Sequence, residues 1–282
     1  MPKISIITIN FNNRDGLKKT IASVINQTCT DFEYIIIDGG SVDGSVDVIK
    51  GYGERINYWI SEPDKGIYNA MNKGIDVAKG EYCLFLNSGD YLYDTNVVSE
   101  LLKNEIDVDF IIGRVYFLNS GTMSCIEDLT MLRFFCSSIP HPSTLIKRVI
   151  LLRNKYDENY KIVSDWKFFI QELILKNASY YLSDIVVASF DSTGVSSLNK
   201  RLVEKERKEV LNELLPDRIR VDYLKMIKGS QYNPTEYDEF FSQLSKYKYS
   251  KYIYSISVIL TRLISLFKKS AAFAFDYSII RK

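Results

Sequence analysis

The sequence predicts an α/β fold with a mostly parallel sheet, flanking helices and a helical C-terminal extension. Three observations predict it: short apolar runs typical of buried strands, amphipathic stretches of helical period between them, and a charge-rich helical pattern from about residue 198 onward. The alternation of strand and helix favours parallel strands joined by crossover helices. We therefore expect an α/β domain at residues 1–197 and a helical region at residues 198–282.

The first part of the α/β domain carries the clearest elements. Buried strands are expected at residues 4–9, 32–37, 56–60 and 82–86, and helices between them at 17–25, 46–49 and 67–78. Later segments are mixed, with strands expected at 110–117, 123–126 and 185–190 and a helix at 165–175. Ligands of such sheets bind outside the carboxyl ends of the strands, so the polar residues that follow each strand are the first candidates for a site.

Composition bounds the class of protein. The chain has 282 residues, of which 46% are hydrophobic and 25% charged, so it is globular rather than disordered or fibrous. Its net charge of +1 gives no overall field suited to nucleic acid. The four cysteines are scattered without a C-x-x-C pair, which disfavours zinc and disulfides and favours a cytoplasmic location. We expect neither a signal peptide nor a simple membrane span.

Charge is distributed unevenly along the chain. Residues 246–282 carry eight basic residues against one acid, Asp276. Apolar residues recur there at helical spacing, with basic flanks and several tyrosines, a pattern typical of a helix lying in an anionic membrane surface. A helix that packs on its own domain or on a second copy of the chain fits the same pattern, so both interpretations stay open.

Polar residues follow the first two strands at the edge where ligands bind. Thr8, Asn10 and Asn12 come at the end of the first strand, and Asp38 at the end of the second. A carboxylate in the second position can accept hydrogen bonds from a ribose or a base N–H. The run from Asp38 to Ser41 also fits a plain turn with helix-capping residues, so its position leaves both roles open. The motifs of nicotinamide-binding and P-loop proteins are missing from the sequence.

Three further residues have side chains suited to chemistry. Asp90 follows the strand at 82–86 and could hold Mg²⁺ or Mn²⁺ with phosphate oxygens, although a lone aspartate in a turn is usually structural. His141, the single histidine, lies between two prolines and either serves a metal or phosphate or bonds to backbone. Asp165 opens a helix, where a carboxylate either complements the helix dipole or acts as a general base.

Four motifs taken together resemble the signature of the family 2 glycosyltransferases, which have the GT-A fold. In order they are SIITINFN at residues 5–12, IIDGGSVDGS at 36–45, SEPDKGIYNAMNKG at 61–74 and FLNSGD at 85–90. The resemblance spans about residues 3–196 and is closest to the bacterial branch that builds surface polysaccharides, including colanic-acid fucosyltransferase-like enzymes. Four motifs in the same order are far more specific than any one of them.

The resemblance implies a nucleotide-sugar site at the strand ends. The nucleoside would contact polar residues after the first strand, the base or ribose the acid after the second, and the diphosphate the loop before the helix at 67–78. The implied nucleotide-sugar residues are Thr8, Asn10, Asn12, Asp38, Lys65, Gly66 and Asn87.

The resemblance also implies a metal site and a general base. Asp90 matches the last carboxylate of the family's metal motif, and His141 would lie close to the Mn²⁺ or Mg²⁺ ion or to the phosphates. Asp165 matches the base of an inverting transfer. Two departures stand out: the metal motif keeps a single acid, and Asn69 stands where relatives often have Asp. The segment from Phe190 to Ser196 resembles the loop that closes over the site.

The implied substrates are a nucleotide-sugar donor and a saccharide acceptor on a lipid carrier, with the basic tail bringing the enzyme to the inner face of the cell membrane. The alternative function is a catalytically inert nucleotide-binding or scaffolding relative, because only one metal-motif acid remains. Nucleic acid is disfavoured as a partner because the basic residues concentrate in the apolar tail.

Overall fold

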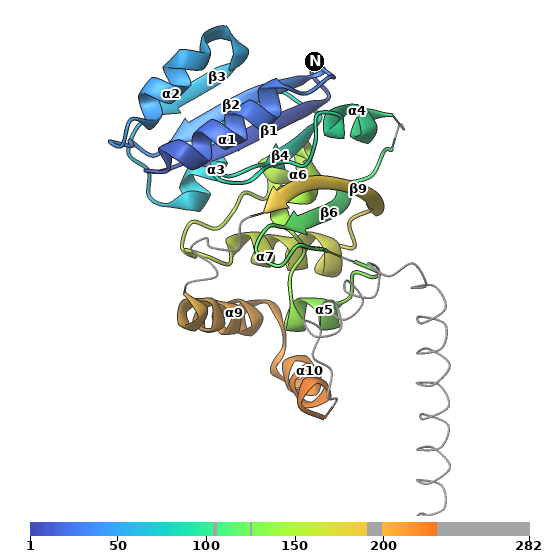
Figure 1. The fold of residues 1–282 in the computed structure, drawn as a ribbon. Coiled ribbons are helices and arrows are strands. Elements are labelled where there is room, and N and C mark those ends of the chain that lie inside the picture. Colours follow the sequence, from blue (N-terminus) through green and yellow to red (C-terminus); the bar gives the residue numbers. More distant parts are fainter. Residues whose placement is uncertain (104–105, 125, 191–198, 230–282) are drawn as a thin grey trace, which may run out of the picture. The chain divides into compact units, whose positions relative to one another are not determined.

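The computed structural model describes residues 1–103, 106–124, 126–190 and 199–229 (Figure 1). The strands are β1 (Ile4–Asn10), β2 (Phe32–Asp38), β3 (Tyr58–Ser61), β4 (Tyr82–Phe85), β5 (Tyr91–Leu92), β6 (Phe110–Phe117), β7 (Thr122–Met123), β8 (Thr144–Lys147) and β9 (Tyr180–Phe190). The α-helices are α1 (Arg14–Ile25), α2 (Ser45–Tyr52), α3 (Ile67–Val77), α4 (Val97–Leu102), α5 (Met131–Cys136), α6 (Arg148–Arg153), α7 (Ser164–Phe169), α9 (Lys200–Leu214) and α10 (Asp217–Gly229). Three short helices complete the elements, the 3₁₀ turns η1 (Gly53–Arg55) and η2 (His141–Ser143) and the π-helix η3 (Ile170–Leu175).

One twisted sheet organises the fold, in the order β3-β2-β1-β4-β8-β6-β9-β5 with β7 paired to β6. The first four strands run parallel, as predicted. Beyond β4 the sheet is mixed, because β8 is antiparallel to both β4 and β6, while β9 is parallel to β6. The predicted α/β class with flanking helices and a helical C-terminal extension is confirmed.

Both faces of β1, β2 and β4 are buried, because successive side chains of a strand point to opposite faces and helices cover each face. In β1, Ile4 and Ile6 pack with apolar residues of α1, α2 and α4, whereas Ile7 and Ile9 pack with residues of α3, α6 and α7. Helix α3 lies close to β1, since a Cβ atom at Gly74 would come within 2.6 Å of the Ile7 side chain. The carboxyl end of β1 therefore lies between α1 on one face of the sheet and α3 on the other.

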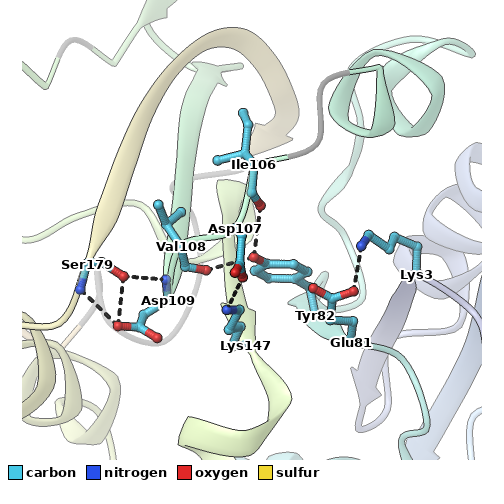
Figure 2. Close-up of polar contacts among 9 residues, drawn as sticks. All are labelled: Lys3, Glu81, Tyr82, Ile106, Asp107, Val108, Asp109, Lys147 and Ser179. Carbon is cyan, nitrogen blue, oxygen red and sulfur yellow. Dashed lines mark hydrogen bonds and ion pairs between the residues drawn. The ribbon is translucent and has the colours of Figure 1, made fainter.

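Polar contacts join the chain segments at the opposite end of the sheet, where β1, β4 and β6 begin (Figure 2). The Tyr82 hydroxyl donates hydrogen bonds to the carbonyls of Ile106 and Val108, at 3.1 and 2.7 Å. Lys147 pairs with Asp107, and Lys3 pairs with Glu81 across 2.5 Å. These hydrogen bonds and ion pairs connect the residues at which β1, β4 and β6 begin. The polar side chains at this end of the strands therefore serve the structure.

The structure departs from the expected elements in the second half of the chain. The strand expected at 123–126 overlaps β7 only at Met123, and the helix expected at 165–175 is split between α7 and the π-helix η3. Sequence reasoning misses β5, β8, α4, α5 and α6, which are short elements with little periodicity. Helices α9 and α10 confirm the helical pattern expected after residue 198 as far as residue 229, where the described part of this region ends.

Two expectations concern residues that the structure does not describe. The loop expected to close over the site at 190–196 falls, after Phe190, outside the described residues, and so does the basic tail at 246–282. Helix α9 lies in the same compact unit as the sheet and buries Val210 against the core of that unit. Among the described residues, no helix is long and apolar enough to cross a membrane.

Candidate active site

The carboxyl ends of β1 and β2 are joined by a buried carboxylate. Asn10 and Asp38 lie opposite each other in the sheet, and the Asn10 amide donates a hydrogen bond of 2.6 Å to Asp38. The Ser41 backbone N–H and hydroxyl, and the Ser61 hydroxyl, donate to the same carboxylate at 2.9, 2.6 and 2.6 Å. Burial alone would raise the pKa of Asp38, but the hydrogen bonds from Ser41, Ser61 and Asn10 outweigh it and hold the pKa below its usual value.

The predicted nucleoside residues differ in their access to solvent. Asp38 and Thr8 are fully buried, and the Thr8 hydroxyl lies 3.0 Å from that of Tyr34. Asn12 is exposed, with a positive φ of 48° that Asn tolerates better than most residues. Its backbone N–H donates to Ser41 at 2.7 Å. Asn10 is only 1% exposed as well, so Thr8, Asn10 and Asp38 lie behind the surface, while Asn12 is exposed.

The loop after β4 carries Asp90 and is held by α1. The Gly89 N–H donates to the Thr20 hydroxyl at 3.0 Å, and that hydroxyl donates to the Asp90 carbonyl at 2.6 Å. Asn13, which caps α1, donates from its amide to the Ser88 carbonyl at 2.8 Å. Gly89 has a φ of +110°, a conformation that L side chains rarely adopt. Because three hydrogen bonds hold this turn, the backbone at Asp90 has a defined position at the carboxyl end of β4.

This turn offers oxygen ligands suited to a hard divalent cation. Asp90 is 7% exposed, and in the same turn the buried side-chain oxygen of Asn87 has no hydrogen-bond partner among the described residues. No group of three or more His, Cys, Asp or Glu residues that could enclose a metal occurs in the described part of the chain. Mg²⁺ is commonly held by one or two carboxylates with substrate phosphates, so this donor set fits a cation that a diphosphate completes.

Asp165 lies in the first turn of α7 and is half-buried. The Tyr68 hydroxyl, from α3, lies 2.8 Å from Oδ1 of Asp165 and 2.6 Å from the Ile162 carbonyl oxygen. Burial, followed by the charge of Asp165, raises the pKa of Tyr68 well above its usual value, so its hydroxyl stays protonated and donates. One carboxylate oxygen is therefore fixed by Tyr68, and Oδ2, which has no hydrogen-bond partner among the described residues, can meet a ligand.

The structure brings His141 into the neighbourhood of Asp165. The ring of His141 stacks on Phe85 with centroids 5.1 Å apart, and its Nε2 lies 2.8 Å from the Tyr156 hydroxyl. Burial lowers the pKa of His141, an effect partly opposed by the negative charge of Asp165, so the ring is neutral at neutral pH. Nε2 is engaged, and Nδ1 bonds to no residue in the part of the chain that the structure describes, so Nδ1 is the ring atom that a ligand could use.

Helix α3 fixes the segment that leads into α7. Asn72 exchanges two hydrogen bonds with the Tyr156 backbone, at 2.9 and 3.0 Å. Asn69 donates to Glu158 at 2.9 Å and accepts a hydrogen bond from the Lys65 N–H at 3.2 Å. The Asn at position 69 therefore has a structural task. Lys65 is exposed and its ammonium makes no ion pair with any described residue, so it is available to an anionic ligand.

Comparison with known proteins decides the family. Residues 5–165, more than half of the chain, match the model described as glycosyl transferase family 2. The chain belongs to glycosyltransferase family 2. It is 30% identical over 214 residues to the PGL/p-HBAD biosynthesis glycosyltransferase of Mycobacterium bovis, covering 73% of this chain and 82% of the relative. It is 28% identical over 260 residues to an uncharacterized glycosyltransferase of Mycobacterium tuberculosis, covering 87% of this chain and 98% of the relative.

Solved structures share the fold of this glycosyltransferase. TarS of S. aureus superposes with a TM-score of 0.60 at 20% identity, over 79% of this chain and 42% of TarS. The mannosyltransferase PcManGT of Pyrobaculum calidifontis, in complex with GDP-Man and Mn²⁺, gives 0.54 at 15% identity, over 71% of this chain and 60% of that one. These likenesses confirm the predicted GT-A fold. The narrower resemblance to colanic-acid fucosyltransferase-like enzymes stays a prediction.

Sequence reasoning about this glycosyltransferase misses several site residues. Tyr68 stands inside the third motif, so its place in the sequence was a usable signal. Tyr156 and Glu206 carry no local signal, because they act only through contacts across the fold. Glu206 of α9 is 5% exposed and accepts hydrogen bonds from the N–H groups of residues 161–163, at 2.9, 3.0 and 3.3 Å.

Proposed function

We propose that this family 2 glycosyltransferase moves a sugar from a nucleotide-sugar donor, with inversion at the anomeric carbon, to a hydroxyl of a lipid-linked saccharide. The observation that carries the proposal is the Asp165 carboxylate, which is half-buried and has one oxygen fixed by Tyr68 at 2.8 Å. A carboxylate fixed in this way meets the geometric demand on a general base.

The donor is proposed to bind across the ends of β1, β2 and β4. Asn12, which is exposed, would contact the nucleoside, with the buried Asn10, Asp38 and Thr8 supporting that contact from behind. Lys65 and Gly66 would face the diphosphate, because the Lys65 ammonium is exposed and the N–H groups at the start of α3 favour anions. TarS in complex with UDP-GlcNAc and PcManGT in complex with GDP-Man support a nucleotide-sugar as the donor class.

A divalent cation is proposed to be held by Asp90, with Asn87 Oδ1 and His141 Nδ1 as further donors. When bound, it would neutralise the charge that develops on the leaving diphosphate. The Asn87 side-chain oxygen, which is buried without a partner among the described residues, supports this assignment, as does the Mn²⁺ in the complex of the structural neighbour PcManGT. The neutral state of His141 suits a ligand, since an imidazolium has no lone pair to offer.

The transfer itself is proposed to use one proton acceptor. Ionised Asp165 takes the proton of the acceptor hydroxyl while that oxygen forms a bond to the anomeric carbon. The bond from the anomeric carbon to the diphosphate oxygen breaks at the same time, and Lys65 stabilises the departing anion. A single displacement of this kind inverts the anomeric configuration, and a positioned base contributes about 10²–10⁴ in rate.

The acceptor is proposed to sit on a lipid carrier at the inner face of the cell membrane. Residues 246–282 support this through their charge, since basic residues flanking an apolar helix are attracted to anionic lipids. The relative named for PGL/p-HBAD biosynthesis supports a role in building a glycosylated product rather than in breakdown.

Donor hydrolysis tests the function directly. Full-length protein is incubated with UDP- and GDP-sugars and Mn²⁺, and the release of nucleoside diphosphate without acceptor is followed. We expect slow release from one donor class, faster release once a suitable acceptor is added, and a product of inverted anomeric configuration by NMR. If no donor is consumed with or without acceptor, the inert or scaffolding relative replaces this proposal.

A further inference from the structure

Helix α9 is tied to the segment that positions Asp165. Both oxygens of the Glu206 carboxylate accept N–H groups of residues 161–163, which immediately precede α7. One turn later Val210 is fully buried in the core. Because α9 is anchored on both sides, the residue after Glu206 has a defined place next to the base.

That residue, Arg207, lies against the residue after the base. Its guanidinium carbon is 4.9 Å from the centroid of the Trp166 ring. The ring is itself fixed, since the Trp166 indole N–H donates to the carbonyls of Phe134 and Ser137, each at 3.1 Å. A cation over the face of an aromatic ring is attracted to the ring's electrons, and this contact uses none of the N–H donors of the guanidinium.

The Arg207 guanidinium has no anionic partner in the described part of the protein. Its Nε is buried without a hydrogen-bond acceptor, and it forms no ion pair there. Burial lowers the pKa of Arg207, and the negative charge of Asp165 opposes that shift from beyond ion-pair distance. Burying a donor or a charge without a partner costs free energy. Binding of an oxyanion to the guanidinium would therefore lower the free energy of this arrangement.

We propose that Arg207 binds an anionic group, a phosphate or a carboxylate, on the acceptor whose hydroxyl Asp165 deprotonates. This inference rests on the proposed function, because it takes Asp165 as the residue that meets the acceptor. It adds a chemical class to the acceptor: a saccharide with an oxyanion close to the attacking hydroxyl. A planar guanidinium suits this task, since its paired donors match the geometry of both groups.

Trp166 reports binding at Arg207 without reference to activity. The chain has two tryptophans, so Trp59→Phe leaves Trp166 as the single fluorophore. This variant is first saturated with Mg²⁺ and with UDP or GDP, whichever raises its Tm more. It is then titrated with inorganic phosphate. We expect a saturable change in Trp166 fluorescence that Arg207→Gln abolishes and that Lys208→Ala, at the exposed neighbouring position, preserves. No saturable change in the parent, or an equal change in Arg207→Gln, overturns the proposal.

Kinetics distinguish an acceptor anion from the donor diphosphate. Matched glycoside acceptors with and without a phosphate group are compared in the wild type, Arg207→Gln and Lys208→Ala. We expect Arg207→Gln to raise the KM of the phosphorylated acceptor about tenfold or more while the donor KM and acceptor-independent hydrolysis stay unchanged. An increase confined to the donor KM contradicts the acceptor assignment. If the wild type hydrolyses no donor, the proposed function fails, whereas the Trp166 titration still tests Arg207.

Discussion

The Tyr68 hydroxyl lies 2.8 Å from Oδ1 of Asp165, although the two residues are 97 positions apart in the chain. This hydrogen bond joins α3, which follows the third strand of the parallel half, to α7, which carries the proposed base. It therefore links the helix beside the donor loop to the side chain expected to meet the acceptor.

Replacing Asp165 by Asn tests the base. The Asn side chain keeps the shape and loses the basic oxygen, so we expect transfer to fall by at least about 10²–10⁴ while nucleotide still binds. Turnover is measured with saturating donor, and nucleotide affinity by calorimetry. Near-native turnover in this variant would remove Asp165 from the role of base.

Replacing Tyr68 by Phe tests the positioning of that base. The change removes one hydroxyl that touches Asp165 and the Ile162 carbonyl, so the carboxylate is less well oriented. We expect kcat to fall about tenfold, a smaller loss than in Asp165→Asn, with the donor KM unchanged. Tyr160→Phe is the control, because the Tyr160 hydroxyl bonds to Glu213, outside this pair. Equal kcat values for Tyr68→Phe and the wild type contradict the positioning role.

Replacing Asp90 by Ala tests the cation. We expect the wild type to bind the nucleoside diphosphate at least about tenfold more tightly with Mn²⁺ than without it, and the variant to lose that difference. Titration calorimetry with and without Mn²⁺ measures both affinities. Asp15→Ala, an exposed acid in the first turn of α1, is the control. A variant that retains the full Mn²⁺ effect would exclude Asp90 as a ligand.

Replacing Glu206 by Ala tests the anchoring of α9. Three backbone N–H groups lose their acceptor, and an unsatisfied buried donor costs about 1–3 kcal/mol, so we expect a lower Tm and reduced kcat. Glu209→Ala, whose carboxylate is half exposed in the same helix, should leave both close to the wild type. Thermal unfolding and steady-state kinetics are measured on all three proteins. An unchanged Tm in Glu206→Ala contradicts the anchor.

Acid pH tests the hydrogen bonds to Asp38. Its folded-state pKa is lowered, so its stabilising contribution is complete above the ordinary carboxyl pKa of about 3.9 and is lost as pH falls through the folded value. We expect Asp38→Asn to have a lower Tm at neutral pH and a flatter loss of Tm between about pH 5 and pH 3. Asp15→Asn, at an exposed acid, should follow the wild type. Parallel Tm curves for Asp38→Asn and the wild type would contradict this account.

Charge reversal in the tail tests the membrane proposal. Each basic residue near an anionic surface contributes about 1 kcal/mol, so reversing Arg262, Lys268 and Lys269 to Glu should lower the bound fraction more than about tenfold. Full-length proteins are floated with phosphatidylcholine vesicles, with and without phosphatidylserine. Lys18→Glu, exposed on α1, is the control. Equal flotation of both variants would favour a tail that packs on its own domain.

Local patterns were sufficient for most of the fold and for the family. The apolar runs of β1, β2 and β4 were predicted closely, because a buried strand reads directly as consecutive apolar residues. Positions after a strand or at a helix start predict Asp38, Asp90 and Asp165 as site residues, and their roles stay predictions. Short elements such as β5 and β8 carry too few residues for any period to show.

The sequence by itself determined the fold class, the family and the acids proposed to carry the chemistry, because these depend on residues that are neighbours in the chain. Only the tertiary structure decided that His141 stacks on Phe85, that Tyr68 reaches Asp165, and that α9 brings Arg207 over the ring of Trp166, the residue after the proposed base. Such contacts join positions far apart in the chain, and no local period or spacing records them. They follow from packing α3, α7 and α9 around a common core, which exists only once the chain is folded.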